Sequence, residues 1–311
     1  MDSDDVAAVV AEVTTLVNEH YVDPAAAVQI TRALAASLAG GRYAADEQSL
    51  AAAVTADLQS VNGDKHLRLV YHVAPLPASD PGDDAAEYAA MASWADRTGH
   101  GIARVEWLTG NIGYLDVQPV LFPPVISGDA VTAAMSLIAP ADALILDLRN
   151  CLGGDPGAAV FLCSYLHGPE PVELTGLYER EHDRVRQQWT LPFVPGRRFG
   201  PAKPVYVLTG SATFSGGEQV AYDLQQLGRA TIIGQRTKGG AHAREGFRVH
   251  PHLEATISVA RAVSPVTGGN WEGSGVTPDI RTSPGDEKDR AHQLALDHVA
   301  AAPGATAAEA G

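Results

Sequence analysis

Apolar side chains recur at helical spacing through the first 61 residues of the chain. Asp23 and Pro24 form a helix start, with a capping side chain followed by a proline at the first helical position, and Gly40-Gly41 follows as a stop. The pattern therefore predicts three helices in an N-terminal helical lobe over residues 1–75. The apolar stripes of the first and third helices are Val6, Val9, Val10, Val13, Leu16 and Val17, and Leu50, Val54, Leu58 and Val61.

The regular spacing of apolar residues is weaker after this lobe and becomes clear again from residue 105. From about residue 72 to 104 the chain is rich in Pro, Ala and Asp ("APLPASDPGDDAAEYAA"). This predicts a connector with one helix over residues 76–104, too short for a domain of ordinary size. From residue 105 to 285, short apolar runs alternate with helical stripes, which predicts an α/β core with right-handed crossovers. The expected strands lie at 111–117, 143–149, 204–210 and 230–235, and the expected helices at 126–139, 155–167 and 216–227.

Two segments fall outside this alternation. Residues 171–200 are polar and rich in arginine, and we expect an excursion or a hairpin there. Residues 286–311 are expected to form a C-terminal helix that ends in a flexible, alanine-rich tail.

Composition narrows the class of partner. The 311 residues carry a formal net charge of −15, which argues against nucleic acid and anionic membranes as partners. No apolar run approaches the roughly 20 residues of a membrane helix. The chain has two cysteines, Cys151 and Cys163, and an acidic start, so we expect a reduced, cytoplasmic protein. Nucleotide-binding glycine motifs are absent from the sequence, and we expect no cofactor.

Glycine-rich turns follow three of the predicted strands. They read "NCLGGDPG", "SATFSGGE" and "TKGGAHA", and carry Gly153 and Gly154, Ser215, and Lys238 to His242. Ligands of open α/β sheets bind beyond the carboxyl ends of the strands, and glycines there allow close approach of backbone amides. The sequence therefore places its candidate chemistry at these turns.

Ser215 precedes a helix, so its surroundings offer unpaired amides and the positive end of a helix dipole, which suits an oxyanion. The sequence leaves open whether this serine is a nucleophile or an ordinary helix cap. A nucleophilic serine needs a base. His66 in "GDKHLRL" could supply it from the helical lobe, and Glu272 in "GGNWEGSGVTPD" could support that base. A metal site is not expected, because "HPH" at 250–252 has no partner motif.

Taken in order, five segments resemble the tail-specific, or C-terminal processing, serine peptidases. They are "GDKHLRL", "NIGYLDV", "LILDLRNCLGG", "TFSGGEQVAYDL" with the following "RATIIGQRTKGGAHA", and "WEGSGVTPD", which together cover residues 60 to 282. The resemblance is strongest to the subgroup with the interphotoreceptor retinoid-binding protein modules and the tricorn-type core. It implies a ββα-spiral core, related to the crotonase and Clp protease folds, beside the three-helix lobe.

The resemblance also implies roles for the residues at these turns. Ser215 becomes the nucleophile of acyl-enzyme chemistry, and the amides of Gly216 and of Gly153 or Gly154 form the oxyanion hole. Processing proteases with a T-x-G-K-G motif use its lysine as base, but this chain has Gly240 at that place.

The tricorn-like branch instead implies His66 as base, supported by Glu272. In this chain His66 is flanked by Lys65 and Leu67, where that branch often carries a serine or threonine. Lys238 and His242 remain competing bases. His242, Gly239 and Gly240 are also candidates for substrate contact.

Two other functions compete with a peptidase. Retinoid-binding relatives use the fold to hold hydrophobic ligands, so the chain could be a catalytically silent binding module. It could also be a non-proteolytic acyl-transfer or cyclising enzyme acting on a small metabolite, because it carries no PDZ domain to hold protein tails. We therefore expect a peptide or a small-molecule acyl compound as substrate.

Overall fold

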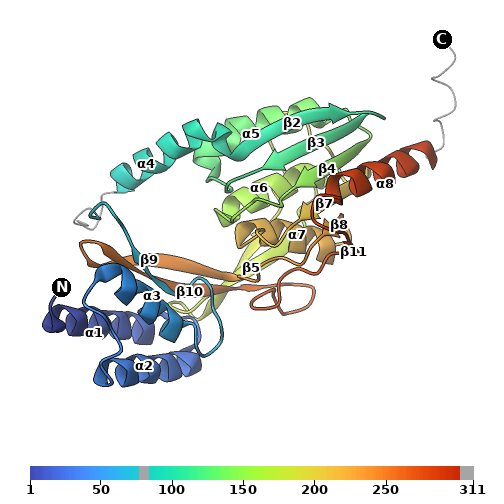
Figure 1. Ribbon diagram of the computed structural model, residues 1–311. Helices are drawn as coiled ribbons and strands as arrows, with labels where there is room; N and C mark the ends of the chain where they lie inside the picture. Colours follow the sequence, from blue (N-terminus) through green and yellow to red (C-terminus); the bar gives the residue numbers. More distant parts are fainter. Residues whose placement is uncertain (77–83, 302–311) are drawn as a thin grey trace, which may run out of the picture. The chain divides into compact units, whose positions relative to one another are not determined.

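The computed structural model describes residues 1–76 and 84–301 (Figure 1). The chain folds into two compact units, each assembled from separated segments. Unit 1 contains Met1–Ala86, Gly176–Arg186 and Gly240–Val263; unit 2 contains Glu87–Thr175, Gln187–Gly239 and Ser264–Gly311. The predicted boundaries at 75, 104 and 285 stay a prediction about domains.

The first part of unit 1 is the expected set of three helices, α1 (Ser3–His20), α2 (Pro24–Ala39) and α3 (Glu47–Leu58). An aspartate caps each N-terminus through its side chain: Asp2, Asp23 and Asp46. The cap of α1 is thus Asp2, and Ser3 is already the first helical residue.

An antiparallel sheet provides the surface on which these helices pack. Its strand order is β1 (Arg68–Tyr71), β10 (Leu253–Val263), β5 (Glu173–Glu179) and β6 (Arg184–Trp189), with β9 (His242–His250) also paired to β10. Leu253, Ala255 and Ile257 of β10 belong to the same buried cluster as the helix stripes. The β5–β6 pair lies in the segment where we expected an excursion or hairpin.

Unit 2 is built on a six-stranded sheet of order β11 (Ile280–Arg281), β8 (Thr231–Gly234), β7 (Val205–Thr209), β4 (Ala143–Asp147), β3 (Ile112–Val117) and β2 (Ile102–Leu108). All neighbouring strands run parallel except β2 and β3, which are antiparallel. Strands β4 and β7 are buried along their whole length, as their continuous apolar runs predict.

Five helices belong mainly to this unit: α4 (Asp84–Arg97), α5 (Pro124–Ile138), α6 (Pro156–Leu166), α7 (Gly216–Gln226) and α8 (Glu287–Ala301). Ala291 and Ala295 of α8 pack in a buried cluster with Ile112, Ile145 and Leu208 of the sheet. Helix α4 is the helix expected in the connector. Residues 77–83 of that connector and the expected tail at 302–311 lie outside the described residues.

The α/β class with an N-terminal helical lobe is confirmed. Among residues 1–76 and 84–301, no helix combines the length and apolar character needed to cross a bilayer. Because β4, β7 and β8 are parallel neighbours, their carboxyl ends share one edge of the sheet. The three glycine-rich turns identified in the sequence follow these three ends.

Candidate active site

Ser215 lies in the turn between β7 and α7, and two backbone-directed contacts fasten that turn to the loop after β4. The buried Thr213 hydroxyl donates to the carbonyl of Leu148 (2.8 Å) and accepts the amide of Gly210 (2.9 Å). The Phe214 amide donates to the carbonyl of Cys151 (3.0 Å). The serine is therefore presented from a turn that cannot move independently of the neighbouring loop.

The backbone of Ser215 has a left-handed conformation, with φ +48° and ψ −119°. Such a conformation is costly for a residue with a Cβ, and it persists only where the surroundings hold it in place. A sharp strand-to-helix turn with a strained serine is also how α/β hydrolases expose their nucleophile. The Glu218 amide donates to the carbonyl of Phe214 (3.4 Å), and Ser215 and Glu218 also form a capping box at this helix start.

Gly153 and Gly154 form the neighbouring turn, with φ values of +123° and +125°. Segment 119–122 anchors this turn: the Leu121 amide donates to the carbonyl of Gly153 and the Asp155 amide to that of Leu121, both at 2.8 Å. A Cβ at Gly154 would lie 2.2 Å from the carbonyl oxygen of Leu121. Only glycine fits there.

The glycine turn lies directly against the nucleophile turn. A Cβ at Gly153 would lie 2.8 Å from the Cβ of Ser215, and one at Gly216 would lie 3.2 Å from the Gly154 nitrogen. Within the described part of the chain, the amides of Gly153, Gly154 and Gly216 donate to no protein acceptor. The structure thus brings the four predicted residues together, with amide donors close to the serine.

A network of ion pairs fixes the start of the loop after β4. Arg149 contacts Asp147 (2.6 Å) and Glu287 of α8 (2.8 Å), and the Tyr114 hydroxyl donates to Asp147 (2.7 Å). The hydrogen bond and charge of Asp147, with those of Glu287, raise the pKa of Arg149, although burial opposes this. Both carboxylates are buried, so the arginine compensates charges that would otherwise be costly.

Lys238 and Glu272 lie in the other turns of unit 2. The Lys238 amide donates to the carbonyl of Thr213 (3.0 Å), and its ammonium lies 4.8 Å from the centre of the Phe214 ring. This position over the ring is the geometry of a cation–π contact. Glu272 lies in a tight turn, where its amide donates to Asn270 (2.9 Å), beside the buried Trp271.

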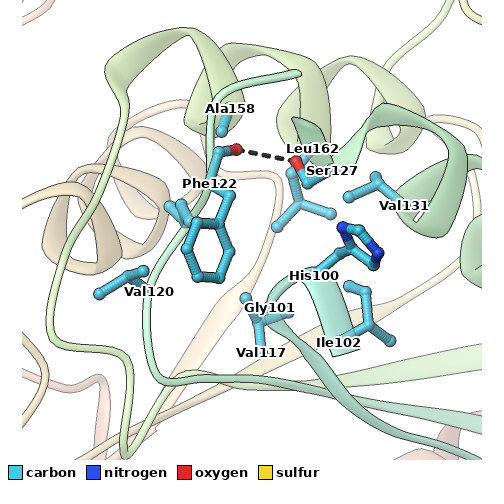
Figure 2. A pocket seen from close by; sticks show the side chains of 11 residues that line it. His100, Gly101, Ile102, Val117, Val120, Phe122, Ser127, Val131, Ala158 and Leu162 are labelled. Atoms are coloured by element: carbon cyan, nitrogen blue, oxygen red, sulfur yellow. Dashed lines mark hydrogen bonds between the residues drawn. The ribbon is translucent and has the colours of Figure 1, made fainter. Parts of the chain in front are cut away.

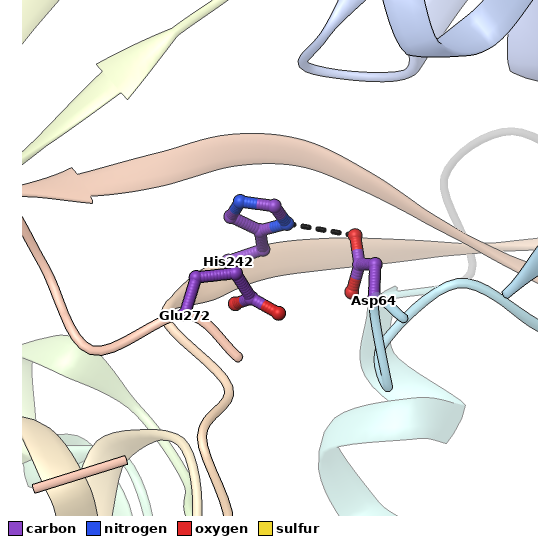
Figure 3. A group of neighbouring side chains, drawn as sticks. All are labelled: Asp64, His242 and Glu272. Carbon is purple, nitrogen blue, oxygen red and sulfur yellow. Dashed lines mark hydrogen bonds and ion pairs between the residues drawn. The ribbon is translucent and has the colours of Figure 1, made fainter. Parts of the chain in front are cut away.

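In unit 1, Asp64 contacts both candidate imidazole residues, and Figure 3 shows its contact with His242. One carboxylate oxygen accepts the backbone amide of His66 (2.9 Å), and the other contacts the Nδ1 atom of His242 (2.7 Å) and accepts the hydroxyl of Tyr21 (3.1 Å). A carboxylate only accepts hydrogen bonds, so Nδ1 of His242 carries the proton. This is the way a triad carboxylate orients its histidine.

The pKa of Asp64 is lowered to about 2. Burial alone would raise it, but the hydrogen bond and charge of His242 outweigh burial, together with the hydrogen bonds of Ser258 and the His66 amide. The carboxylate is therefore ionised at neutral pH.

A small cavity lies behind the segment that anchors the glycine turn (Figure 2). Its volume is about 10 Å³, and Val117, Phe122 and Leu162 are among its lining residues. The Ser127 hydroxyl beside it donates to the carbonyl of Phe122 (2.8 Å), so this polar group is already paired. A cavity of this size has room for about one water molecule, not for a peptide side chain.

The two histidines of the "HPH" segment have separate protein partners. His250 pairs with Glu47 (3.2 Å), and Nδ1 of His252 contacts the carbonyl of His72 (2.9 Å). This arrangement gives no support to a metal site built on that segment.

Comparison with known proteins identifies the fold and the family. Residues 111–282 match the model of peptidase family S41, and residues 3–98 match the model described as the N-terminal domain of Peptidase_S41 in eukaryotic IRBP. The first match alone spans more than half of the chain. The chain belongs to peptidase family S41.

Solved structures show the same fold at low sequence identity. A putative peptidase from Parabacteroides merdae is 16% identical, with a TM-score of 0.64 over 96% of this chain and 97% of that one. The photosystem II D1 C-terminal processing protease is 16% identical, with a TM-score of 0.55 over 92% and 94%. The tricorn protease is 14% identical, with a TM-score of 0.63 over 96% of this chain and 37% of its own.

The family expected from the five sequence segments is therefore confirmed, and this S41 protein is a serine-type peptidase. Of its site residues, Ser215, Gly153, Gly154, Gly216, Gly239 and Glu272 belong to unit 2, whereas His66, Gly240 and His242 belong to unit 1. Their roles stay predictions.

Sequence reasoning missed two residues of these networks. Asp64 had no signal beyond its place in "GDKH", because its partners Tyr21 and His242 are remote in the sequence. Glu218 did have one: a serine followed three residues later by a glutamate is the pattern of a capping box.

The glycine turn yields a first prediction. Gly154→Ala places a methyl group against the Leu121 carbonyl at an unfavourable φ, so we expect labelling by a serine-directed fluorophosphonate to slow by at least about 10²-fold. Gly128→Ala in α5 is the control, since its new methyl meets nothing within 4 Å and gains roughly 1 kcal/mol of helix propensity. Labelling of Gly154→Ala at the wild-type rate would contradict the assignment.

The second prediction concerns pH. The folded-state pKa of Asp64, about 2, lies below its ordinary value, so ionised Asp64 stabilises the fold at neutral pH by about 2 kcal/mol. This contribution is lost as the pH falls from about 4 towards 2. In urea unfolding, the gap in unfolding free energy between wild type and Asp64→Asn should narrow over that range.

The matched control is Asp23→Asn, which keeps a good helix cap on the exposed end of α2. We expect that variant to stay close to wild type at every pH. A gap for Asp64→Asn that is independent of pH would show that the charge of Asp64 is not what stabilises the fold.

Proposed function

We propose that this S41 protein hydrolyses peptides through an acyl-enzyme formed on Ser215. The observation that carries the proposal is the packing of the strained Ser215 turn against the Gly153–Gly154 turn, where three amides have no protein acceptor among residues 1–76 and 84–301. A strained nucleophile beside preorganised donors is the arrangement acyl transfer requires.

In the proposed mechanism, the Ser215 hydroxyl attacks the scissile carbonyl while a base takes its proton. The negative charge that develops on the carbonyl oxygen is held by the amides of Gly216 and of Gly153 or Gly154. Each such donor is worth about 3 kcal/mol of barrier. The base returns its proton to the leaving amine, and a water molecule then attacks the acyl-enzyme and releases the acid.

We assign the base to His66, with Glu272 stabilising its charged form, as the family resemblance implies. His66 is buried, and its backbone is fixed at both ends: its amide donates to Asp64 (2.9 Å), and its carbonyl accepts the Thr256 hydroxyl (2.6 Å). Such anchoring supports a precisely placed ring.

A specific observation favours a second candidate base. His242 has an ionised carboxylate on its Nδ1 atom, which fixes the proton of the ring on that nitrogen. This is the carboxylate–imidazole pair that orients the base in serine hydrolases. The two assignments differ in which single substitution removes activity.

Labelling with a fluorophosphonate tests the nucleophile. Ser215→Ala should abolish labelling and the cleavage of a fluorescent peptide library, because the Thr213 hydroxyl of that turn is buried and already donates to the Leu148 carbonyl. Ser211→Ala, an exposed serine of the same loop, should react like wild type. Labelling that survives in Ser215→Ala would refute the proposal.

The same assay separates the bases. His66→Gln should lower the labelling rate by about 10²- to 10⁴-fold and remove the acid limb of the pH–rate profile, because a glutamine takes no proton. His72→Gln, which breaks a pair with Glu254, is the control in the same unit. If His242→Gln has the large effect and His66→Gln does not, the base is the Asp64–His242 pair.

We place the enzyme in the cytoplasm, because both cysteines are free and buried. Burial raises the pKa of Cys151 to about 11, so this thiol is unreactive. Unlinked cysteines are typical of reducing compartments. Cell fractionation tests this: recovery in the cytosolic fraction supports it, and recovery with membranes or in the medium contradicts it.

A further inference from the structure

Glu218 is a buried carboxylate that accepts hydrogen bonds from at least three donors in two turns. It is the third residue of α7, and its side chain has no solvent exposure. One oxygen accepts the Ser215 amide (3.0 Å). The other accepts the Gly239 amide (2.7 Å) and the hydroxyl of Thr237. A buried carboxylate is tolerated only where donors and a favourable dipole compensate its charge, and the start of α7 supplies both.

A third turn is attached through Thr237. The Thr237 hydroxyl accepts the Val276 amide (2.7 Å), and the Thr237 amide donates to the carbonyl of Val276 (3.1 Å). The turns are also in close contact, since a Cβ at Gly275 would lie 2.2 Å from the Thr237 carbonyl oxygen. The turn that follows Glu272 is thus linked to Glu218 through Thr237.

We infer that Glu218 is a positioning residue for the proposed reaction: its carboxylate holds the left-handed Ser215 turn in register with the turns that carry Lys238 and Glu272. The inference rests on the proposed function, because it assigns Glu218 to the support of the nucleophile. Glu218 takes no part in proton transfer. It fixes the peptide group before Ser215, so the serine keeps a conformation that is otherwise costly.

Glu218→Gln tests this with almost no change in volume. A carboxylate accepts at both oxygens, whereas an amide accepts at one and donates at the other. Whichever way the amide turns, its NH₂ group faces either the Ser215 amide or the Gly239 amide. One turn therefore loses its acceptor while the core stays filled.

The readout is the rate of fluorophosphonate labelling as a function of probe concentration. For Glu218→Gln we expect the maximal rate to fall by about 10²-fold. The concentration that gives half the maximal rate should change little, because the probe still binds and only the nucleophile is misplaced. A merely structural role would not separate these two quantities.

Asp223→Asn is the matched control. Asp223 is a buried carboxylate on the same helix, its pKa is raised to about 6 by burial, and it accepts the Thr175 amide (2.9 Å) away from the nucleophile turn. We expect a lower Tm in Asp223→Asn with a wild-type maximal rate. Equal slowing in both variants would mean a general loosening of α7 and would overturn the inference, as would a wild-type rate in Glu218→Gln.

If Glu218→Gln does not fold, Thr237 provides the test. Thr237→Val removes one donor to Glu218 and should lower the maximal rate, whereas Thr237→Ser keeps the hydroxyl and should restore it. A wild-type rate in Thr237→Val would overturn the inference. Labelling retained in Ser215→Ala would instead refute the proposed function, so the two failures are distinguishable.

Discussion

The close approach of two backbones, the Gly153–Gly154 turn and the first residues of α7, is the constraint on which the chemistry of unit 2 depends. Any side chain on the glycines would collide with Leu121 or with Ser215 itself. The approach brings amides that have no acceptor in the described part of the protein beside a serine hydroxyl. It also explains why the turn is anchored by segment 119–122 and by the Arg149 network, since a mobile turn would lose the arrangement.

In both units a buried carboxylate accepts hydrogen bonds from segments that are distant in the sequence and so holds them together. In unit 1, Asp64 accepts from Tyr21, the His66 amide and His242; in unit 2, Glu218 accepts from Ser215, Thr237 and Gly239. Each carboxylate has no exposed surface. A buried carboxylate binds several donors strongly and tolerates the loss of none, which makes it an effective clamp for turns that must keep their geometry.

The sequence predicts the helices and the parallel strands well, because their signals are local. The Asp-Pro start of α2 and the continuous apolar runs of β4 and β7 are examples. The β9–β10 hairpin was not predicted, because charged residues such as Arg244 and Glu245 obscure the alternation of β9. That strand begins at His242, so its pairing with Asp64 could not be inferred either.

The sequence predicted which residues form the turn of the candidate nucleophile, but it did not predict how they are arranged in space. The glycine-rich turns pointed to Ser215, Gly153 and Gly154 because parallel strands end at one edge. The left-handed backbone of Ser215 has no signal of its own, since serine is common at helix starts and the strain arises from tertiary contacts. Which imidazole acts as base also depends on packing between segments that are remote in the sequence.

Unit 1 is assembled from separated segments of the chain, and this affects how the protein folds during translation. Helices α1 to α3 are synthesised first, but the strand that completes their core, β10, emerges only after residue 253. At ordinary elongation rates the delay is on the order of ten seconds. During that time the apolar faces of the nascent helices can pack on one another and on β1 but lack the contribution of β10, so part of their apolar surface stays open to aggregation.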